Sequence, residues 1–290
     1  MEENQSRPQK TVGDAISYSG VGIHTGKEVS IRFCPAPENT GIVFQRVDIQ
    51  GKPTIPASID YVQDTSRSTT IGIGQVRVHT VEHVMAALRA FSIDNLVVQV
   101  TDAEPPIGDG SSKIFVEMLD EVGVSLQNHT KPILSLKQPV FFSKGETHLV
   151  ALPSDRYRIS YTLHYPLTPV IRSQYLSFLV TEEIFKEEIA PCRTFALYEE
   201  ITTLMERGLI RGGSLENAVV IKDDVIFSKE GLRFSDEMVR HKILDLIGDL
   251  ALVGFDFNAH VIAIRSGHAA NVALGKELLN HFLNPVSTYD

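Results

Sequence analysis

The chain has 290 residues, of which 43% are hydrophobic and 22% charged, a balance typical of a globular protein with one large domain or two of ordinary size. Its net charge of −9 argues against nucleic acid and anionic membranes as partners, and no window approaches the roughly 20 apolar residues of a membrane span. Because residues 1–14 lack the apolar core of a secretory signal and two cysteines cannot form a disulfide framework, we expect a cytoplasmic protein.

The first half opens with short strands, because apolar and polar residues alternate there between Gly, Pro and Asn. Strands are expected in residues 20–36 and 40–47, then a hairpin over 69–78 that turns near Gly72 to Gly74. The pattern next predicts a helix over 80–91, a strand over 95–100 and a second helix over 113–123, which ends at Gly123.

Residues 125–132, SLQNHTKP, have the composition of a linker, so we expect domains of 1–129 and 130–290. The strand pattern then resumes over 132–142, 146–153 and 157–163, and it is followed by helices over 194–208 and 239–254 and a strand at 260–267. In each half a histidine-bearing helix, with His83 or His241, precedes an apolar strand, as in a duplicated α+β unit.

The helix over 239–254 carries His241, Asp245 and Asp249 along one edge. Consecutive residues of an α-helix are about 100° apart around its axis, so Asp245 lies about 40° and Asp249 about 80° from His241. A solubilising face more often mixes Lys, Glu, Gln and Ser, whereas an imidazole and a carboxylate four residues apart can bind one cation. The pair suits zinc, and an ordinary exposed or interhelical pair is the alternative.

A third ligand can come from the stretch HTVEH in two ways. The pattern matches an inverted zincin motif, with His79 and His83 as ligands and Glu82 as the base of a zinc peptidase. Alternatively, Thr80 is the N-cap of the helix, His79 belongs to the preceding strand, and His83 alone joins the pair on the other helix.

The second version predicts a metal-dependent hydrolase. Zinc can lower the pKa of a bound water to about 7, and Glu82 can accept the remaining proton. His268, which we expect in a glycine-flanked loop after a strand, can protonate a leaving amine, and Asp249 can hold its imidazolium. A binding module with a closed, structural metal site is the non-enzymatic alternative.

Six stretches add to this pattern: SGVGIHTG (19–26), TVEH (80–83), IAPCRTF (189–195), RGGSLENAVV (211–220), GLRFSDEMVRHKILDLIGDL (231–250) and GHAAN (267–271). In this order, and across nearly the whole chain, they resemble the UDP-3-O-acyl-N-acetylglucosamine deacetylases, zinc amidases of lipid A biosynthesis. The block around His241 is the most specific of the six.

The resemblance implies a role for each matching residue. It implies zinc ligands His83, His241 and Asp245, a general base Glu82, an acid unit of Asp249 and His268, an oxyanion contact from Thr194, substrate contacts from Phe195 and Lys242, and a residue at the rim of the site, His24. Ferrous iron is the alternative cation, since a His-His-Asp set accepts either metal.

The resemblance also implies an α+β fold: two similar domains, each a sheet layered with helices, pack helix to helix around a site at their interface. An inserted β-α-β piece that forms a passage for the acyl chain is expected at 170–190. The implied reaction is hydrolysis of the N-acetyl group of a UDP-linked, 3-O-acylated glucosamine, which releases acetate. We expect a monomer.

Overall fold

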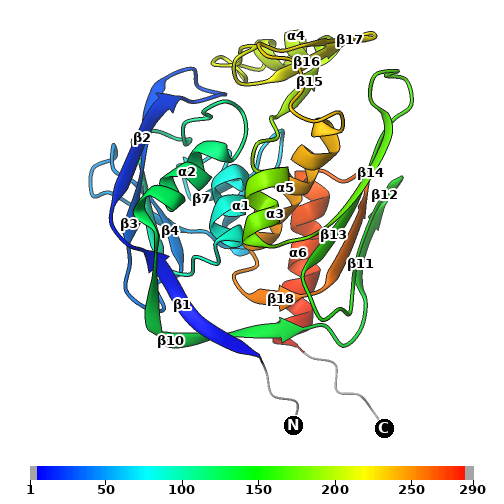
Figure 1. Cartoon of the computed structure of the whole chain (residues 1–290). Helices are drawn as coiled ribbons and strands as arrows, with labels where there is room; N and C mark the ends of the chain where they lie inside the picture. The colour runs from blue at the N-terminus through cyan, green and yellow to red at the C-terminus, as the bar shows by residue number, and fades with distance from the viewer. Residues whose placement is uncertain (1–4, 285–290) are drawn as a thin grey trace.

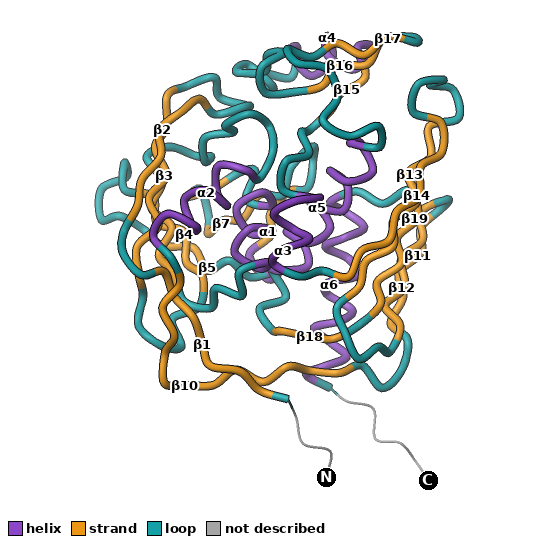
Figure 2. The backbone as a smooth tube through the Cα atoms, in the orientation of Figure 1, coloured by secondary structure: helices purple, strands orange, loops and turns teal. Residues whose placement is uncertain are grey.

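The computed structural model describes residues 5–284 and shows a mixed α+β protein (Figures 1 and 2). One five-stranded sheet comes from the first half, in the order β2-β3-β9-β4-β5. Its strands are β2 (Ile16–Val21), β3 (Glu28–Pro35), β4 (Ile42–Arg46), β5 (Thr54–Pro56) and β9 (Leu96–Val100). The helices of this half are α1 (Glu82–Ala90) and α2 (Lys113–Val122), and α2 ends at Gly123 as expected.

A second five-stranded sheet comes from the second half, in the order β11-β12-β19-β13-β14. Its strands are β11 (Val140–Lys144), β12 (Thr147–Leu152), β13 (Arg158–Tyr165), β14 (Arg172–Leu179) and β19 (His260–Ile264). In both sheets the last strand in the sequence lies in the centre, parallel to the third strand and antiparallel to the second. The two halves therefore repeat one strand topology.

Helices fill the space between the two sheets (Figure 1). The second half contributes α5 (Glu237–Ala251) and α6 (His268–Leu283), and α5 packs along α1 of the first half. Buried apolar side chains of both halves form one continuous core. The sequence indicates an amphipathic α5 with a polar edge, but α5 is buried on almost every side, and its polar edge faces the interior.

Three smaller sheets complete the molecule. One contains β6 (Val62–Asp64), β7 (Thr70–Ile73) and β8 (Val76–Val78), and a second contains β1 (Ser6–Val12), β10 (Val124–Ser135) and β18 (Asp256–Asn258). The third contains β15 (Phe195–Leu197), β16 (Val219–Lys222) and β17 (Val225–Phe227), with α4 (Tyr198–Glu206) between its first two strands. Short helical turns are η1 (Ile59–Tyr61), α3 (Glu182–Ile184) and η2 (Phe185–Ile189).

The structure corrects the expected linker at residues 125–132. This segment belongs to β10, which pairs antiparallel with β1 and, at its end, parallel with β18. Most of its polar residues are exposed although β10 is the central strand of this small sheet, and this is why their composition resembles that of a linker. The expected boundary near residue 130 thus lies inside a strand that pairs with strands from both halves.

Two further expectations are wrong. Residues 170–190 do not form a β-α-β insert, because β14 is the edge strand of the second large sheet, antiparallel to β13. The β-α-β unit lies later, where β15 pairs parallel with β16 and α4 connects them. It forms a separate lobe at the top of Figure 1. Helix α6 was also missed; His268 is its first residue and does not lie in a loop.

Contact between α1 and α5 depends on a glycine. A Cβ atom placed on Gly248 would lie 2.0 Å from the carbonyl oxygen of Glu82, so a side chain there would force the helices apart. We expect Gly248→Ala to destabilise the protein by about 1–3 kcal/mol and to weaken metal binding, because His83 would move with α1. Denaturant unfolding and metal titration would measure both effects.

A matched control is Gly275→Ala on α6. Its Cβ would meet the end of the flexible Ile59 side chain at 2.3 Å, so that side chain can rotate away, and the site is not touched. A milder loss of stability and unchanged metal binding are expected. A Gly248→Ala protein with wild-type stability and metal affinity would contradict the tight contact between the helices.

Candidate metal centre and its cavity

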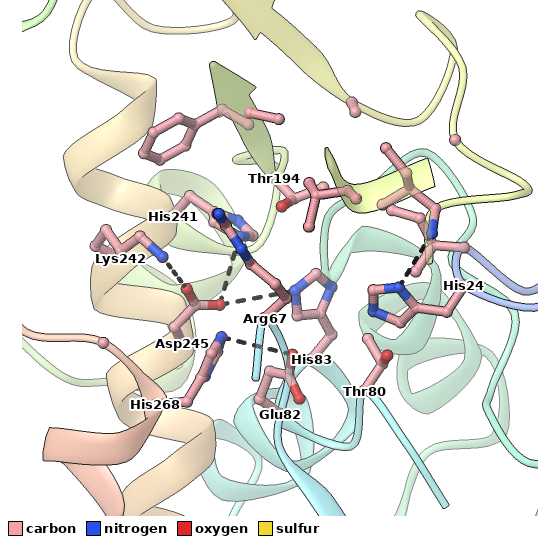
Figure 3. Close-up of a pocket in the computed structure, with 18 of the residues that line it drawn as sticks. His24, Arg67, Thr80, Glu82, His83, Thr194, His241, Lys242, Asp245 and His268 are labelled. Carbon is pink, nitrogen blue, oxygen red and sulfur yellow. Dashed lines mark hydrogen bonds and ion pairs between the residues drawn. The ribbon is translucent and has the colours of Figure 1, made fainter. Parts of the chain in front are cut away.

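Three buried side chains meet between α1 and α5 (Figure 3). His83 comes from the first turn of α1, and His241 and Asp245 are one turn apart on α5. One ligand atom from each lies within 4.8 Å of the other two. The Nε2 atoms of His83 and His241 are 3.7 and 3.4 Å from Asp245 Oδ1, which is too far for ordinary hydrogen bonds and suits donors around one cation.

The protonation of these groups fits a cation. His241 Nδ1 lies 3.1 Å from the carbonyl oxygen of Cys192, so this nitrogen carries the proton and Nε2 is free to coordinate. Burial and then the neighbouring His241 lower the pKa of His83 to about 3, and its Nδ1 has no partner among the described residues. Burial also lowers the pKa of His241. Both imidazoles are therefore neutral at pH 7, as metal ligands must be.

Asp245 supplies the negative charge of the group. Burial acts to raise the pKa of its carboxyl, but the positive charges of Lys242 and, further away, His268 outweigh burial and hold the pKa well below its usual range. Lys242 Nζ lies 2.8 Å from Asp245 Oδ2, so one oxygen is paired with the lysine and Oδ1 faces the histidines. Two neutral imidazoles and one carboxylate form a donor set that fits zinc.

Glu82 lies beside this group with one oxygen held and one free. Its Oε2 accepts a hydrogen bond of 3.0 Å from the backbone N–H of Thr69, while Oε1 is 4.0 Å from His268 Nε2. Burial raises the pKa of Glu82 to about 8, although the charge of His268 opposes this. A carboxyl whose pKa lies near neutral pH can exchange protons during a reaction. A bound divalent cation would lower this pKa.

His268 is cationic at neutral pH. Burial acts to lower its pKa, but the carboxylate of Asp249 raises it to about 9. His268 Nδ1 lies 2.9 Å from Asp249 Oδ2, and Asp249 also accepts hydrogen bonds from Thr69 Oγ1 and Asn271 Nδ2, at 2.5 and 2.8 Å. The predicted pairing of Asp249 with His268 is thus present in the structure, at the start of α6.

These groups line a cavity of about 760 Å³. The other predicted residues Thr194, Phe195, Lys242 and His24 line it as well, whereas Asp249 lies behind His268. The Phe195 ring packs edge to face on Tyr165. Lys242 Nζ is 5.6 Å from the centroid of the Phe195 ring. The β-α-β lobe contributes these apolar side chains to the lining: Ile201, Leu204, Met205, Leu215 and Val220.

His24 lies where the two halves meet above the cavity. The buried carboxylate of Glu104 accepts hydrogen bonds from the backbone N–H groups of His24 and Thr25, and thereby fixes the GIHTG turn. The His24 ring and carbonyl in turn accept hydrogen bonds from the backbone N–H groups of Ile210 and Arg211. The turn therefore ties the first half to the β-α-β lobe.

His79 does not belong to the metal group or to the cavity lining. Its Nδ1 lies 2.8 Å from Thr70 Oγ1, so its ring is used within the small sheet that precedes α1. Of the two interpretations of HTVEH, this geometry favours the one with a single ligand. The expected N-cap Thr80 is wrong, however, because Val81 occupies that position and no side chain caps the helix.

Two important contacts were not predicted from the sequence. Thr69 donates one hydrogen bond to Glu82 from its backbone N–H and another to Asp249 from its hydroxyl. No local sequence pattern indicates this role of Thr69. Glu237 and Arg193 form a fully buried ion pair, with Nε 2.8 Å from Oε1, that fixes the segment before Thr194. Glu237 lies four residues before His241 and therefore continues the four-residue spacing of His241, Asp245 and Asp249 toward the start of α5. That spacing is a signal from which Glu237 could have been predicted.

A buried His-His-Asp group with an adjacent carboxyl and a cationic imidazole, open to one cavity, defines a metal-dependent hydrolase. A family model described as LpxC, UDP-3-O-acyl N-acetylglycosamine deacetylase, matches residues 9–280. The UDP-3-O-acyl-N-acetylglucosamine deacetylase of Chlamydia caviae is 56% identical over 94% of this chain and 97% of its own length. The enzyme of Chlamydia pneumoniae is 54% identical over 94% of this chain and 97% of its own length. That of Chlamydia trachomatis serovar L2 is 50% identical over 94% of this chain and 95% of its own length.

The chain therefore belongs to the LpxC deacetylase family, and the function anticipated from its motifs, a metal-dependent deacetylase of lipid A biosynthesis, is confirmed. None of the helices between residues 5 and 284 combines the length and the apolar character of a membrane span.

Proposed function

We propose that this chain hydrolyses the N-acetyl group of a UDP-linked, 3-O-acylated N-acetylglucosamine in the cytoplasm, releasing acetate and the free 2-amine. The observation that carries the proposal is the convergence of His83 with His241 and Asp245 from opposite halves of the chain onto one point in a large cavity. The printed names of the relatives supply the substrate class.

His83, His241 and Asp245 would hold the cation, which we propose to be zinc, with ferrous iron as the alternative. When bound, such a cation acts as a Lewis acid toward a water molecule and the amide carbonyl. The part of the chain that the structure describes supplies three protein ligands, and three are typical of a catalytic site, whereas a structural zinc site usually has four.

Glu82 is the proposed general base. The backbone N–H of Thr69 holds one carboxylate oxygen, so the other is oriented and available to take a proton from the attacking water. Its burial matches this task, because a carboxyl with a raised pKa is a stronger base than an exposed one. Thr194, on the opposite side of the cavity, is the proposed hydrogen-bond donor to the developing oxyanion.

His268 is the proposed general acid. Its charged form is stabilised by Asp249, and its Nε2 points toward Glu82, so a proton on this nitrogen can reach an amine that leaves the same centre. Asp249 acts through His268 and does not line the cavity itself.

Lys242, Phe195 and His24 are the proposed substrate contacts, at positions around the cavity wall. The acyl chain is proposed to lie against the apolar side chains that the β-α-β lobe contributes to the cavity lining. We further propose that the two large sheets with their helices are two similar domains of a monomer, divided near residue 130, with the site at their interface. The repeated strand order and the packing of α1 against α5 support this division.

Removal of the metal tests the proposed function. We expect the purified protein to release acetate from UDP-3-O-acyl-N-acetylglucosamine, to lose this activity after treatment with a chelator, and to regain it with one equivalent of zinc or ferrous iron. Acetate release and metal content are measured on the same samples. Full activity without metal, or bound metal without any release of acetate, would contradict the proposal.

The Asp249–His268 pair makes the activity depend on pH. His268 must be protonated to act as an acid, so activity is present below its pKa of about 9 and is lost as the pH rises through that value. Asp249→Asn removes the charge that raises this pKa. We expect the alkaline limb of the pH–rate profile to move to lower pH, with a loss on the order of tenfold at pH 8.

Asn271→Ala is the matched control for this effect. It removes a neutral partner of the Asp249 carboxylate but leaves the charge beside His268. The position of its alkaline limb should therefore stay close to that of the wild type. An unshifted profile in Asp249→Asn would show that His268 does not supply the titrating proton.

A further inference from the structure

Thr80 is an anomalous residue in the wall of the cavity. Its φ is 55°, in the left-handed region, where a β-branched residue is strongly disfavoured. Its hydroxyl is buried and has no hydrogen-bond partner between residues 5 and 284, and the residue is 5% exposed. Such strain and such unpaired groups both cost stability, and both concentrate at functional sites.

The surrounding backbone explains how the strain persists. On one side of Thr80, the N–H of His79 donates to the carbonyl of Ala103, and on the other, the N–H of Val81 donates to the carbonyl of Thr69. These two hydrogen bonds hold the peptides that flank the residue. Thr80 therefore keeps its conformation although its hydroxyl does not cap α1.

Its position suggests what the hydroxyl contacts. Thr80 lies two residues before Glu82, and Figure 3 shows its side chain below His24, on the side of the metal group away from Lys242. The apolar side chains in the cavity lining offer no partner for a hydroxyl. The sugar that carries the acetamido group must lie next to the metal group, and its hydroxyl and amide groups can both donate and accept hydrogen bonds.

We propose that Thr80 is a substrate-binding residue whose hydroxyl hydrogen-bonds a polar group of the glucosamine unit. This inference rests on the proposed function. It explains why a buried hydroxyl lacks a partner within the described part of the chain and why a strained backbone is kept there: both orient the hydroxyl toward bound sugar. The contact contributes to recognition of the sugar and is independent of metal binding.

The test compares Thr80→Val, which keeps the shape and removes the hydroxyl, with Thr80→Ser, which keeps the hydroxyl. We expect Thr80→Val to lower kcat/KM about tenfold to a hundredfold, mainly through KM, while metal content is unchanged and Tm is unchanged or higher. Thr80→Ser should stay close to the wild type. In a Glu82→Gln background, which turns over slowly, Thr80→Val should raise the Kd for intact substrate by a similar factor, as measured by calorimetry.

Thr70→Val is the matched control. Thr70 is equally buried, but its hydroxyl is already paired with His79 and it does not line the cavity. Its loss should lower Tm and leave kcat/KM unchanged, the reverse of Thr80→Val. The inference would be overturned if Thr80→Val kept the kcat/KM and Kd of the wild type, or if it lost Tm and metal. Either result leaves the proposed function standing as long as the wild-type protein releases acetate. A wild-type protein that released none would overturn the proposed function as well.

Discussion

Glu82→Gln is expected to keep its metal and to lose about 10²- to 10⁴-fold in kcat, the usual contribution of a general base. Glutamine has the shape of glutamate and can still accept the hydrogen bond from the Thr69 N–H, but it cannot take a proton from water. Acetate release and metal content, measured together, would show whether the chemistry is lost and the binding kept.

Two results would contradict this role. A variant that lost its metal would show that Glu82 is a fourth ligand, as in a closed structural site. A variant with nearly normal kcat would show that another group accepts the proton. Glu82→Asp serves as the companion variant, because it keeps the carboxylate on a side chain that is shorter by one methylene. If the role of Glu82 is proton transfer, Glu82→Asp should retain more activity than Glu82→Gln.

Asp245→Ala is expected to lose metal and activity together. The variant lacks one of three ligands and the only carboxylate of the metal group, and it leaves the partly buried Lys242 ammonium without its partner at 2.8 Å. We expect metal affinity to fall by at least about 100-fold, with a further loss of stability of about 1–3 kcal/mol from the lost partner of this ammonium. Titration with zinc against a competing chelator measures the first effect, and denaturant unfolding measures the second.

His79→Ala is the matched control and separates the two interpretations of HTVEH. His79 lies outside the metal group and bonds Thr70, so its loss should cost about 1 kcal/mol of stability and leave metal affinity unchanged. A zinc peptidase of the inverted zincin type requires the opposite: loss of metal in His79→Ala and retention in Asp245→Ala.

Local patterns in the sequence were enough to find most of the residues that meet at the centre. His241, Asp245 and Asp249 lie on one side of a long helix, and helical geometry alone places them together. The position of Glu82 next to His83 suggested a base beside a ligand. The matching motifs then identified the family, which the relatives confirm.

Local patterns failed where a side chain or a strand depends on partners far along the chain. The polar residues of β10 resemble a linker, yet they form a strand because β1 and β18 supply its hydrogen bonds. Thr80 looks like an N-cap, but Val81 takes that position, and the hydrogen bonds of its neighbours hold Thr80 in a left-handed conformation. The β-α-β lobe was placed too early because the apolar pattern of 170–190 serves β14 equally well.

The sequence by itself determined the chemistry of the donors and the family, because residue types and short spacings are local properties. Only the tertiary structure decided that His83 meets the α5 pair, that Glu82 and Asp249 share Thr69, and that His268 begins a helix beside them. The reason is physical: these contacts exist because α1 packs closely against α5 at Gly248, and no local pattern in either helix specifies that distance.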